Sequence, residues 1–319
     1  MVSRYAEPEL AVAFRHFYPG FNANDFWLPL LERATGWNAY STSVTNASLV
    51  FTSVYETYLD VWKRRLLSKR STPGLPRPPK HLPATVKSIW VSGENLRPPA
   101  EDYDLTISFD TDSYGGRNVY WPYIFENLDW GFNTRSSSKS HFTPRGVPRL
   151  LPIDVSRPRK SYVSDRPGFV CAFIGNPEPI RLRAIDALRS YGKVEVFGSA
   201  FGRPIPNKYD VAKNFRFVLA FENDVYPGYV TEKPLEAYAC GAIPLWRGLD
   251  SQHLLNPKSM VNALDFPSLN LFAKHVATLA ANRDELEFMT QQALFNETPS
   301  LHTLEQHLTS VIHSNERNA

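Results

Sequence analysis

"YVTEKPLEAYACGAIPLW", from Tyr229 to Trp246, predicts a short helix followed directly by a buried strand. Thr231 is a suitable N-cap, and Pro234 is tolerated in the first turn of a helix. Gly241 ends the helix, because glycine readily adopts the left-handed conformation that follows a last helical turn. The apolar run after it has the length and composition of a strand buried in a sheet.

Two oppositely charged residues, Glu232 and Lys233, open this helix. The carboxylate suits the positive end of the helix dipole, whereas the ammonium does not. A lysine is favourable there when an anion completes the site, because free helix N–H groups and an ammonium together bind phosphate. Glu232 could then accept hydrogen bonds from ribose hydroxyls. In the alternative interpretation Lys233 points into solvent, and the residues alone leave both open.

Strands alternate with helices on both sides of this stretch. The expected strands are residues 168–175, 193–198, 215–223 and 242–246, and the expected helices are residues 179–192 and 231–240. Such alternation predicts a doubly wound, parallel α/β sheet, whose ligands bind at the carboxyl ends of the strands. Two helical stretches follow, residues 268–295 and 300–313, so the chain should end in helices.

The N-terminal half also has an α/β pattern. Strand-like runs occur at residues 11–17, 47–55, 86–93 and 104–110. Residues 24–34 read as a helix capped by Asn24 or Asp25. The proline-rich passage from Thr143 to Pro167 is expected to connect two domains. We therefore expect one domain over residues 1–155 and a second over residues 156–319.

Composition favours a globular protein with two domains. The chain has 319 residues, of which 43% are hydrophobic and 21% charged, with a net charge of +3. Cys171 and Cys240 both lie in apolar runs, which indicates buried free thiols in a reducing compartment. No apolar run is long enough to span a bilayer, and the N-terminus lacks the pattern of a signal peptide. These features predict a cytoplasmic protein.

One basic stretch stands out, residues Lys63 to Lys80, with seven positive residues and no acidic one. The simpler interpretation is a solvated helix end that runs into a proline-rich loop. The alternative is weak contact with an anionic membrane surface or an anionic glycolipid, which would place the protein at the inner face of the membrane. No pattern here indicates a nucleic-acid partner.

The chain resembles the alpha-1,3-fucosyltransferase family, glycosyltransferase family 10, of bacterial type. The resemblance is most specific in "FRFVLAFEN" (Phe215–Asn223) followed by "YVTEKPLEAYACGAIPLWRG". The family pattern is a Tyr-Lys-Phe strand, Phe-Glu-Asn, a variable loop, Tyr-x-Thr-Glu-Lys, a helix and a proline-containing strand. This chain departs from it at the start of the strand, where Phe215 and Arg216 replace Tyr and Lys and the positive charge is kept. Weaker likenesses are "VSGEN", "DYDLTISFD", "VYWPYIF" and "PIRLRAIDAL", so the resemblance covers roughly residues 85–250.

The resemblance implies a GT-B fold, with two Rossmann-like domains facing across a cleft and C-terminal helices. The N-terminal domain would bind the acceptor, and the C-terminal domain would bind the donor, GDP-β-L-fucose. The implied reaction is an inverting displacement that needs a base for the acceptor hydroxyl and cations for the departing GDP.

Particular residues then take particular roles. Glu94, at the end of an apolar strand and after Gly93, would be the general base. Its alternative is a loop residue that hydrogen-bonds nearby backbone. The other expected residues bind GDP-fucose: Arg181 and Lys233 at the pyrophosphate, with Arg183 as the substitute for Arg181, Glu232 at the ribose, and Asn223 and Tyr229 lining the donor pocket. Glu222 is interpreted as a structural partner and is not assigned to the site.

A metal or other cofactor is not expected. Asp110-Thr111-Asp112 matches the Asp-x-Asp pattern by which GT-A enzymes hold a divalent metal, but two carboxylates and a spacer are a very weak pattern. We interpret it as a strand end with a capping loop. The histidines show no pair at metal-ligand spacing.

The function we expect is transfer of L-fucose to a hydroxyl, O3, of GlcNAc or glucose in an oligosaccharide or glycolipid acceptor. One alternative is the same scaffold with another GDP-sugar, such as a D-arabinose-type donor, which lacks one methyl group of fucose. A pocket gains only about 1–3 kcal/mol from a methyl group, so such donors are hard to separate. The other alternative is a catalytically idle module that binds sugar nucleotides or glycans.

Overall fold

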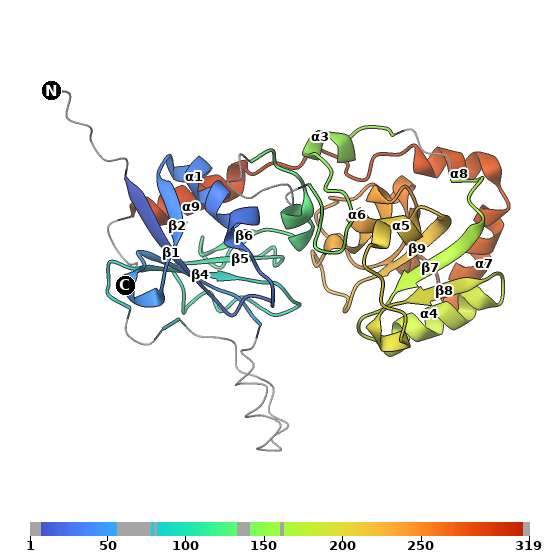
Figure 1. Ribbon diagram of the computed structural model, residues 1–319, viewed down its shortest axis with the longest axis horizontal. Helices are drawn as coiled ribbons and strands as arrows, with labels where there is room; N and C mark the ends of the chain where they lie inside the picture. Colours follow the sequence, from blue (N-terminus) through green and yellow to red (C-terminus); the bar gives the residue numbers. More distant parts are fainter. Residues whose placement is uncertain (1–7, 56–77, 80–81, 133–140, 160–162, 315–319) are drawn as a thin grey trace, which may run out of the picture. The chain divides into compact units, whose positions relative to one another are not determined.

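A computed structural model of the chain describes residues 8–55, 78–79, 82–132, 141–159 and 163–314. The chain divides into two compact units (Figure 1). The first contains Met1–Trp121, Phe132–Ser137 and Ser300–Ala319, and the second contains Pro122–Gly131 and Ser138–Pro299. The chain therefore passes between the units more than once, whereas the sequence analysis expected a single boundary between residues 155 and 156.

The first unit holds a six-stranded sheet in the order β2-β1-β3-β4-β5-β6, and every described strand pair in it is parallel. Its strands are β1 (Glu9–Arg15), β2 (Asn38–Ser41), β3 (Leu49–Thr52), β4 (Lys87–Val91), β5 (Leu105–Ser108) and β6 (Asn118–Tyr120). All residues of β3, β4 and β5 are buried. Continuous burial is typical of a parallel sheet covered on both faces. The sequence predicted β1, β3, β4 and β5, and it missed the short strands β2 and β6.

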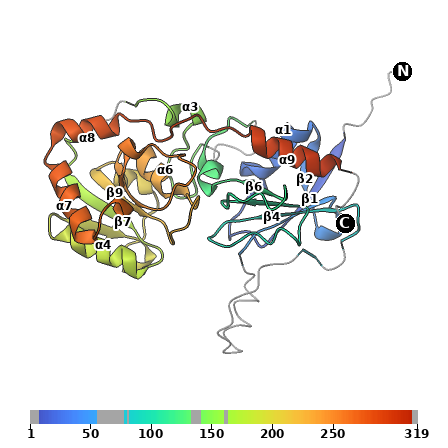
Figure 2. The ribbon, with the colours of Figure 1, turned by 180° about the vertical axis from the view of Figure 1, so that it is seen from behind.

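The C-terminal helix α9 (His302–His313) belongs to this first unit, where it packs beside α1 (Trp27–Thr35) (Figure 2). Arg33 Nε lies 2.6 Å from Glu305 Oε1, and Thr309 Oγ1 donates a hydrogen bond of 2.9 Å to the carbonyl of Ala34. Leu304 and Leu308 are fully buried. The sequence analysis placed the whole helical tail in the C-terminal domain. The structure instead places α9 in the first unit, where its apolar face is buried.

The second unit holds a five-stranded parallel sheet in the order β11-β10-β9-β7-β8. Its strands are β7 (Gly168–Phe173), β8 (Val194–Phe197), β9 (Phe215–Phe221), β10 (Ile243–Arg247) and β11 (Val261–Asn262). Its helices are α3 (Pro152–Val155), α4 (Pro179–Arg189), α5 (Lys208–Ala212), α6 (Glu232–Ala239), α7 (Leu269–Ala280) and α8 (Arg283–Thr290). The chain turns back across the sheet after β8, so β7 and β9 flank a topological switch point.

Helices cover both faces of the second sheet. Alternate residues of a strand point to opposite faces, so Val170 packs with α4, α7 and α8 on one side, and Cys171 with α5 and α6 on the other. Cys171 and Cys240 are buried free thiols, as predicted, and burial raises the pKa of Cys240 to about 12. The doubly wound architecture predicted from the sequence is confirmed, apart from the missed elements α3, α5 and β11.

Two local predictions were wrong. Asn22, not Asn24 or Asp25, caps the 3-10 turn Ala23–Asp25 that precedes α1. The proline-rich passage lies within the second unit instead of between the units. Its described valines are buried in that unit, with Val147 at 1% exposure and Val155 and Val163 at 0%. Burial of these side chains explains why the passage packs instead of serving as a linker.

The remaining 3-10 turns are Val44–Asn46, Tyr123–Asn127, Ser199–Phe201, Pro257–Ser259 and Ala263–Asp265. Within the described part of the chain, no helix is both long and apolar enough to cross a membrane. The basic stretch from Lys63 to Lys80 lies outside the described residues, except for Pro78 and Pro79.

Gly198, which follows β8, offers a test of the second unit's packing. Its φ is 122°, and an added Cβ would lie 2.2 Å from the carbonyl oxygen of Ile174, in the loop after β7. Gly198→Ala should therefore lower the free energy of unfolding by about 2–4 kcal/mol, from strain plus a clash with backbone. Gly202→Ala is the matched control, since Gly202 also has a positive φ, 63°, but no atom within 4 Å of an added Cβ. Gly202→Ala should lower the free energy of unfolding by about 1 kcal/mol, from the positive φ alone. Urea denaturation of both variants checks this, and equal losses would show that the close approach does not matter.

Candidate active site

The carboxyl ends of β7 and β9 lie side by side at the switch point, since Ala172 pairs with Leu219. Arg181, in the first turn of α4, joins the loops that follow these two strands. Its Nη2 donates to the carbonyl of Phe221 at 2.7 Å and to Oδ1 of Asn223 at 2.6 Å. Its Nη1 donates to the carbonyl of Asn176 at 3.2 Å. The structure thus brings together two of the predicted donor-site residues, Arg181 and Asn223.

Arg181 is largely buried, at 6% exposure, whereas Asn223 is exposed. Burial lowers the pKa of the Arg181 guanidinium, and the nearby Glu222 carboxylate opposes that effect. Arg181 therefore stabilises the two loops and keeps only part of its hydrogen-bonding capacity for a ligand. Arg183, the expected substitute, is exposed on α4.

Glu222, directly after β9, is a fully buried carboxylate with 0% exposure. Its Oε1 accepts hydrogen bonds from the backbone N–H of Thr231 at 2.9 Å and from Nε1 of Trp246 at 3.2 Å. Its Oε2 accepts from Oγ1 of Thr231 at 2.6 Å and from Nζ of Lys233 at 3.1 Å. Glu222 thus closes the loop between β9 and α6, in agreement with its interpretation as a structural partner.

Helix α6 has the bounds that the sequence predicted, with Thr231 at its N-cap position and Gly241 at a φ of 74° after its end. The Thr231 side chain makes no capping hydrogen bond, however. Its hydroxyl instead donates to Glu222 and accepts a hydrogen bond from Nζ of Lys233. The first N–H groups of α6 are therefore not capped by this side chain.

Lys233 does not point freely into solvent, so the alternative interpretation of this residue is wrong. Its side chain is 19% exposed, and Nζ donates to Oγ1 of Thr231 at 2.7 Å as well as to Glu222. Burial by itself would lower the pKa of Lys233, but the Glu222 and Glu232 carboxylates outweigh it and raise the pKa above its ordinary value. The ammonium is therefore a fixed positive charge at the start of α6.

Glu232 lies beside two cations. Its Oε1 is 3.3 Å from Nη1 of Arg145 and 3.6 Å from Nζ of Lys233. Burial opposes its ionisation, but the charges of Lys233, Arg145 and Lys208 lower its pKa to about 2. Glu232 is therefore ionised at neutral pH and can accept hydrogen bonds from hydroxyl groups. The sequence analysis did not identify Arg145, which is 87 residues away in the chain.

Tyr229 belongs to the same loop and is buried, at 2% exposure, with its backbone N–H donating to the carbonyl of Tyr226 at 3.1 Å. Five of the predicted site residues thus lie at or next to the carboxyl edge of the second sheet: Arg181, Asn223, Tyr229, Glu232 and Lys233.

Glu94 lies in the first unit, three residues after the end of β4. Its carbonyl accepts hydrogen bonds from Oγ of Ser92 at 2.7 Å and from the N–H of Leu96 at 2.7 Å, which forms a tight turn. A Cβ at position 93 would lie 2.8 Å from the Tyr55 ring, so a larger residue there would require that ring to shift. The side chain of Glu94 is partly buried at the carboxyl edge of the first sheet.

The carboxylates of the Asp-x-Asp pair, Asp110 and Asp112, bond to residues of the same region of the chain. Oδ2 of Asp110 is 3.3 Å from Nη1 of Arg97 and accepts from the Tyr114 hydroxyl at 2.9 Å. Oδ1 of Asp112 accepts from the N–H of Tyr114 at 2.9 Å. This geometry agrees with a strand end and its capping loop. Among the residues that the structure describes, no group of three or more His, Cys, Asp or Glu side chains could hold a metal ion.

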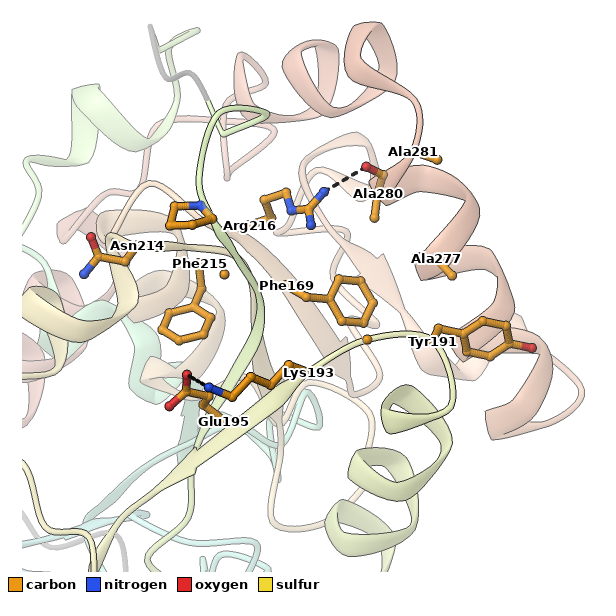
Figure 3. A pocket seen from close by; sticks show the side chains of 13 residues that line it. Phe169, Tyr191, Lys193, Glu195, Asn214, Phe215, Arg216, Ala277, Ala280 and Ala281 are labelled. Atoms are coloured by element: carbon orange, nitrogen blue, oxygen red, sulfur yellow. Dashed lines mark hydrogen bonds and ion pairs between the residues drawn. The ribbon is translucent and has the colours of Figure 1, made fainter.

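A pocket of about 680 Å³ lies at the opposite edge of the second sheet, near the amino ends of β7, β8 and β9 (Figure 3). Phe169, Tyr191 and Phe215 supply aromatic walls, and the Arg216 guanidinium donates to the carbonyl of Ala280 at 3.0 Å. None of the predicted site residues lines this pocket. The charged cluster and the pocket are thus separate features.

Comparison with known proteins finds a family match over the second unit. Residues 163–307 match the family described as glycosyltransferase family 10 (fucosyltransferase) C-term. The chain is 28% identical over 221 residues to the alpha-(1,3)-fucosyltransferase FucT of Helicobacter pylori. The matched region covers 62% of this chain and 45% of that protein. The chain is 25% identical over 237 residues to the human 3-galactosyl-N-acetylglucosaminide 4-alpha-L-fucosyltransferase FUT3. The matched region covers 69% of this chain and 56% of that protein. The chain thus spans about half the length of the curated relatives it matches.

Solved structures show the same fold. The structure of an alpha1,3-fucosyltransferase with GDP matches at a TM-score of 0.68 and 22% identity, over 99% of this chain and 94% of that one. The structure of an alpha1,3-fucosyltransferase with GDP-fucose also gives a TM-score of 0.68, at 20% identity over 99% and 94%. The fold is GT-B, as predicted, with two parallel α/β units. The resemblance to the alpha-1,3-fucosyltransferases of glycosyltransferase family 10 is therefore confirmed, and residues 163–307 match that family's C-terminal domain.

Proposed function

We propose that the protein is an inverting alpha-1,3-fucosyltransferase that moves L-fucose from GDP-β-L-fucose to a hydroxyl of a sugar acceptor. The observation that carries the proposal is the charged cluster at the switch point of the second unit, where Lys233 is fixed between Glu222 and Thr231 at the start of α6. A helix start with a fixed ammonium is a site for a phosphate group. The names of the relatives and the GDP and GDP-fucose in the matching structures support this choice of donor.

The donor would be held by residues of the second unit. The Lys233 ammonium at the start of α6 would bind the diphosphate, together with the N–H groups of Arg181 that its loop contacts leave available. Glu232, ionised at neutral pH, would accept the ribose hydroxyls. Asn223 and Tyr229 would line the donor pocket. These protein cations would neutralise the GDP that departs, so the proposed mechanism needs no metal and no cofactor.

The base would be Glu94. In the proposed step its carboxylate takes the proton of the acceptor hydroxyl while the hydroxyl oxygen forms a bond to the anomeric carbon. The bond from that carbon to the β-phosphate oxygen breaks, and its electron pair leaves with GDP. A single displacement of this kind inverts the β-fucoside of the donor to an α-fucoside.

The acceptor we propose is O3 of GlcNAc or glucose in an oligosaccharide or a glycolipid. The relatives include enzymes named for both the 3- and the 4-linkage, so the acceptor panel must offer both hydroxyls. A glycolipid acceptor would agree with a weak contact between the basic stretch Lys63–Lys80 and an anionic membrane surface.

Turnover of GDP-fucose with an acceptor panel in excess EDTA tests the proposed function. We expect release of GDP and a fucosylated product at a rate that the chelator does not change, because protein side chains stabilise the leaving group. Loss of activity in EDTA that manganese restores would contradict metal independence and favour the Asp110–Asp112 pair. Turnover of another GDP-sugar in place of GDP-fucose would correct the donor. GDP binding without turnover of any acceptor would indicate the idle module.

Glu94→Gln tests the base, since glutamine keeps the size of the side chain but cannot take the proton. We expect kcat to fall by about 10²–10⁴, the usual scale for loss of a general base. GDP affinity and melting temperature should stay near those of the wild type, because the defect is chemical. Glu101→Gln, at an exposed position in the same unit, is the control. A lowered melting temperature with kcat retained would instead assign Glu94 a structural role.

A further inference from the structure

Arg145 reaches the candidate donor site from a hairpin that the sequence analysis placed in a connecting passage. The hairpin is closed by an antiparallel bridge between Phe142 and Pro148 and by a hydrogen bond of 2.8 Å from the N–H of Thr143 to the carbonyl of Val147. Gly146 occupies its turn with a φ of 74°. Both the hairpin and α6 belong to the second compact unit.

The backbone at Arg145 is fixed on two sides. Its carbonyl accepts a hydrogen bond of 3.0 Å from the N–H of Lys208, the first residue of α5. Gly146 packs against Asn207 so closely that an added Cβ would lie 2.7 Å from Cγ of Asn207. Val147 is buried at 1% exposure. The hairpin is therefore a firm support from which the Arg145 side chain extends.

The side chain itself is left open. It is 58% exposed, and its one hydrogen bond within the described part of the chain joins Nη1 to Oε1 of Glu232 at 3.3 Å. A guanidinium has five N–H donors, so most of its capacity is unused. The neighbouring cations are more fully occupied, since Lys208 is paired with Glu236 and Lys233 with Glu222 and Thr231.

Arg145 and Lys233 share an acceptor. Both lie within 3.6 Å of the same oxygen, Oε1 of Glu232, so the two cations are held next to each other at the start of α6. A diphosphate that met Lys233 there would also come within reach of the open guanidinium. The planar fork of arginine matches phosphate oxygens in a bidentate manner.

We propose that Arg145 is a diphosphate-binding residue of the donor site, which keeps one N–H on Glu232 and offers the others to the nucleotide's phosphates. The inference rests on the proposed function, because it assumes that a nucleoside diphosphate binds at the start of α6. Two other roles are possible for the same contact. Arg145 could act only through Glu232, by orienting the carboxylate for the ribose, or it could form an ordinary surface ion pair that contributes little.

A series of ligands that differ in phosphate number separates these roles. Calorimetry would compare guanosine, GMP and GDP on the wild type, Arg145→Ala, Arg145→Lys and Lys233→Ala. Arg189→Ala is the matched control, because Arg189 is 52% exposed and its Nη1 lies 3.1 Å from a single carboxylate oxygen, Oδ1 of Asp186, on α4. Melting temperatures would be measured on the same preparations.

For Arg145→Ala we expect GDP binding to weaken about 5- to 30-fold, GMP binding to weaken less, and guanosine binding to change less than about twofold. Lys233→Ala should show the same dependence on phosphate number. Arg145→Lys should recover part of the GDP affinity, since a point charge replaces the bidentate fork. Arg189→Ala should bind all three ligands like the wild type.

Three results would overturn the inference. An equal loss for guanosine and GDP would show that Arg145 acts through Glu232 and the ribose. GDP affinity unchanged in a folded Arg145→Ala protein would leave only a surface ion pair. Failure of the wild type to bind GDP at all would overturn the proposed donor, and the inference with it, whereas the first two results leave the proposed donor intact.

Discussion

The buried carboxylate of Glu222 is the interaction on which the site depends. It has no exposed surface, and its charge is tolerated because four donors from Thr231, Lys233 and Trp246 surround it. Loss of any one partner would leave a buried charge partly unpaired, which typically costs several kcal/mol. The path of the loop from β9 to α6, and the position of the Lys233 ammonium, are therefore determined by one side chain that need not touch a ligand.

The sheet of the second unit has two edges with different chemistry. Charged side chains lie at the carboxyl edge, at the strand ends of the switch point and at the start of α6. Arg181 joins the loops that follow β7 and β9 there. At the amino edge, aromatic side chains line the pocket of about 680 Å³ (Figure 3). The fixed ammonium of Lys233 at the start of α6 favours anionic ligands at the first edge.

Much of the second unit could be predicted, because its strands are continuous apolar runs and α6 carries its own start and stop signals. The side-chain contacts could not. Whether Thr231 caps α6 or bonds Glu222 depends on a carboxylate nine residues earlier in the chain. The Arg145 contact joins residues far apart in the sequence, and the prolines around it favoured a linker over a packed hairpin. The sequence also could not predict that α9 packs in the first unit, because an amphipathic helix does not specify which surface buries its apolar face.

Hydrogen–deuterium exchange of the wild-type protein with and without GDP tests most directly whether the carboxyl edge of the second sheet is the nucleotide site. We predict slower exchange in peptides that cover residues 176–181 and 223–233, where the loops after β7 and β9 and the start of α6 lie. Peptides that cover residues 191–195 and 214–216, at the pocket of the amino edge, should exchange at unchanged rates. Protection at the amino edge without protection at the carboxyl edge would contradict the account.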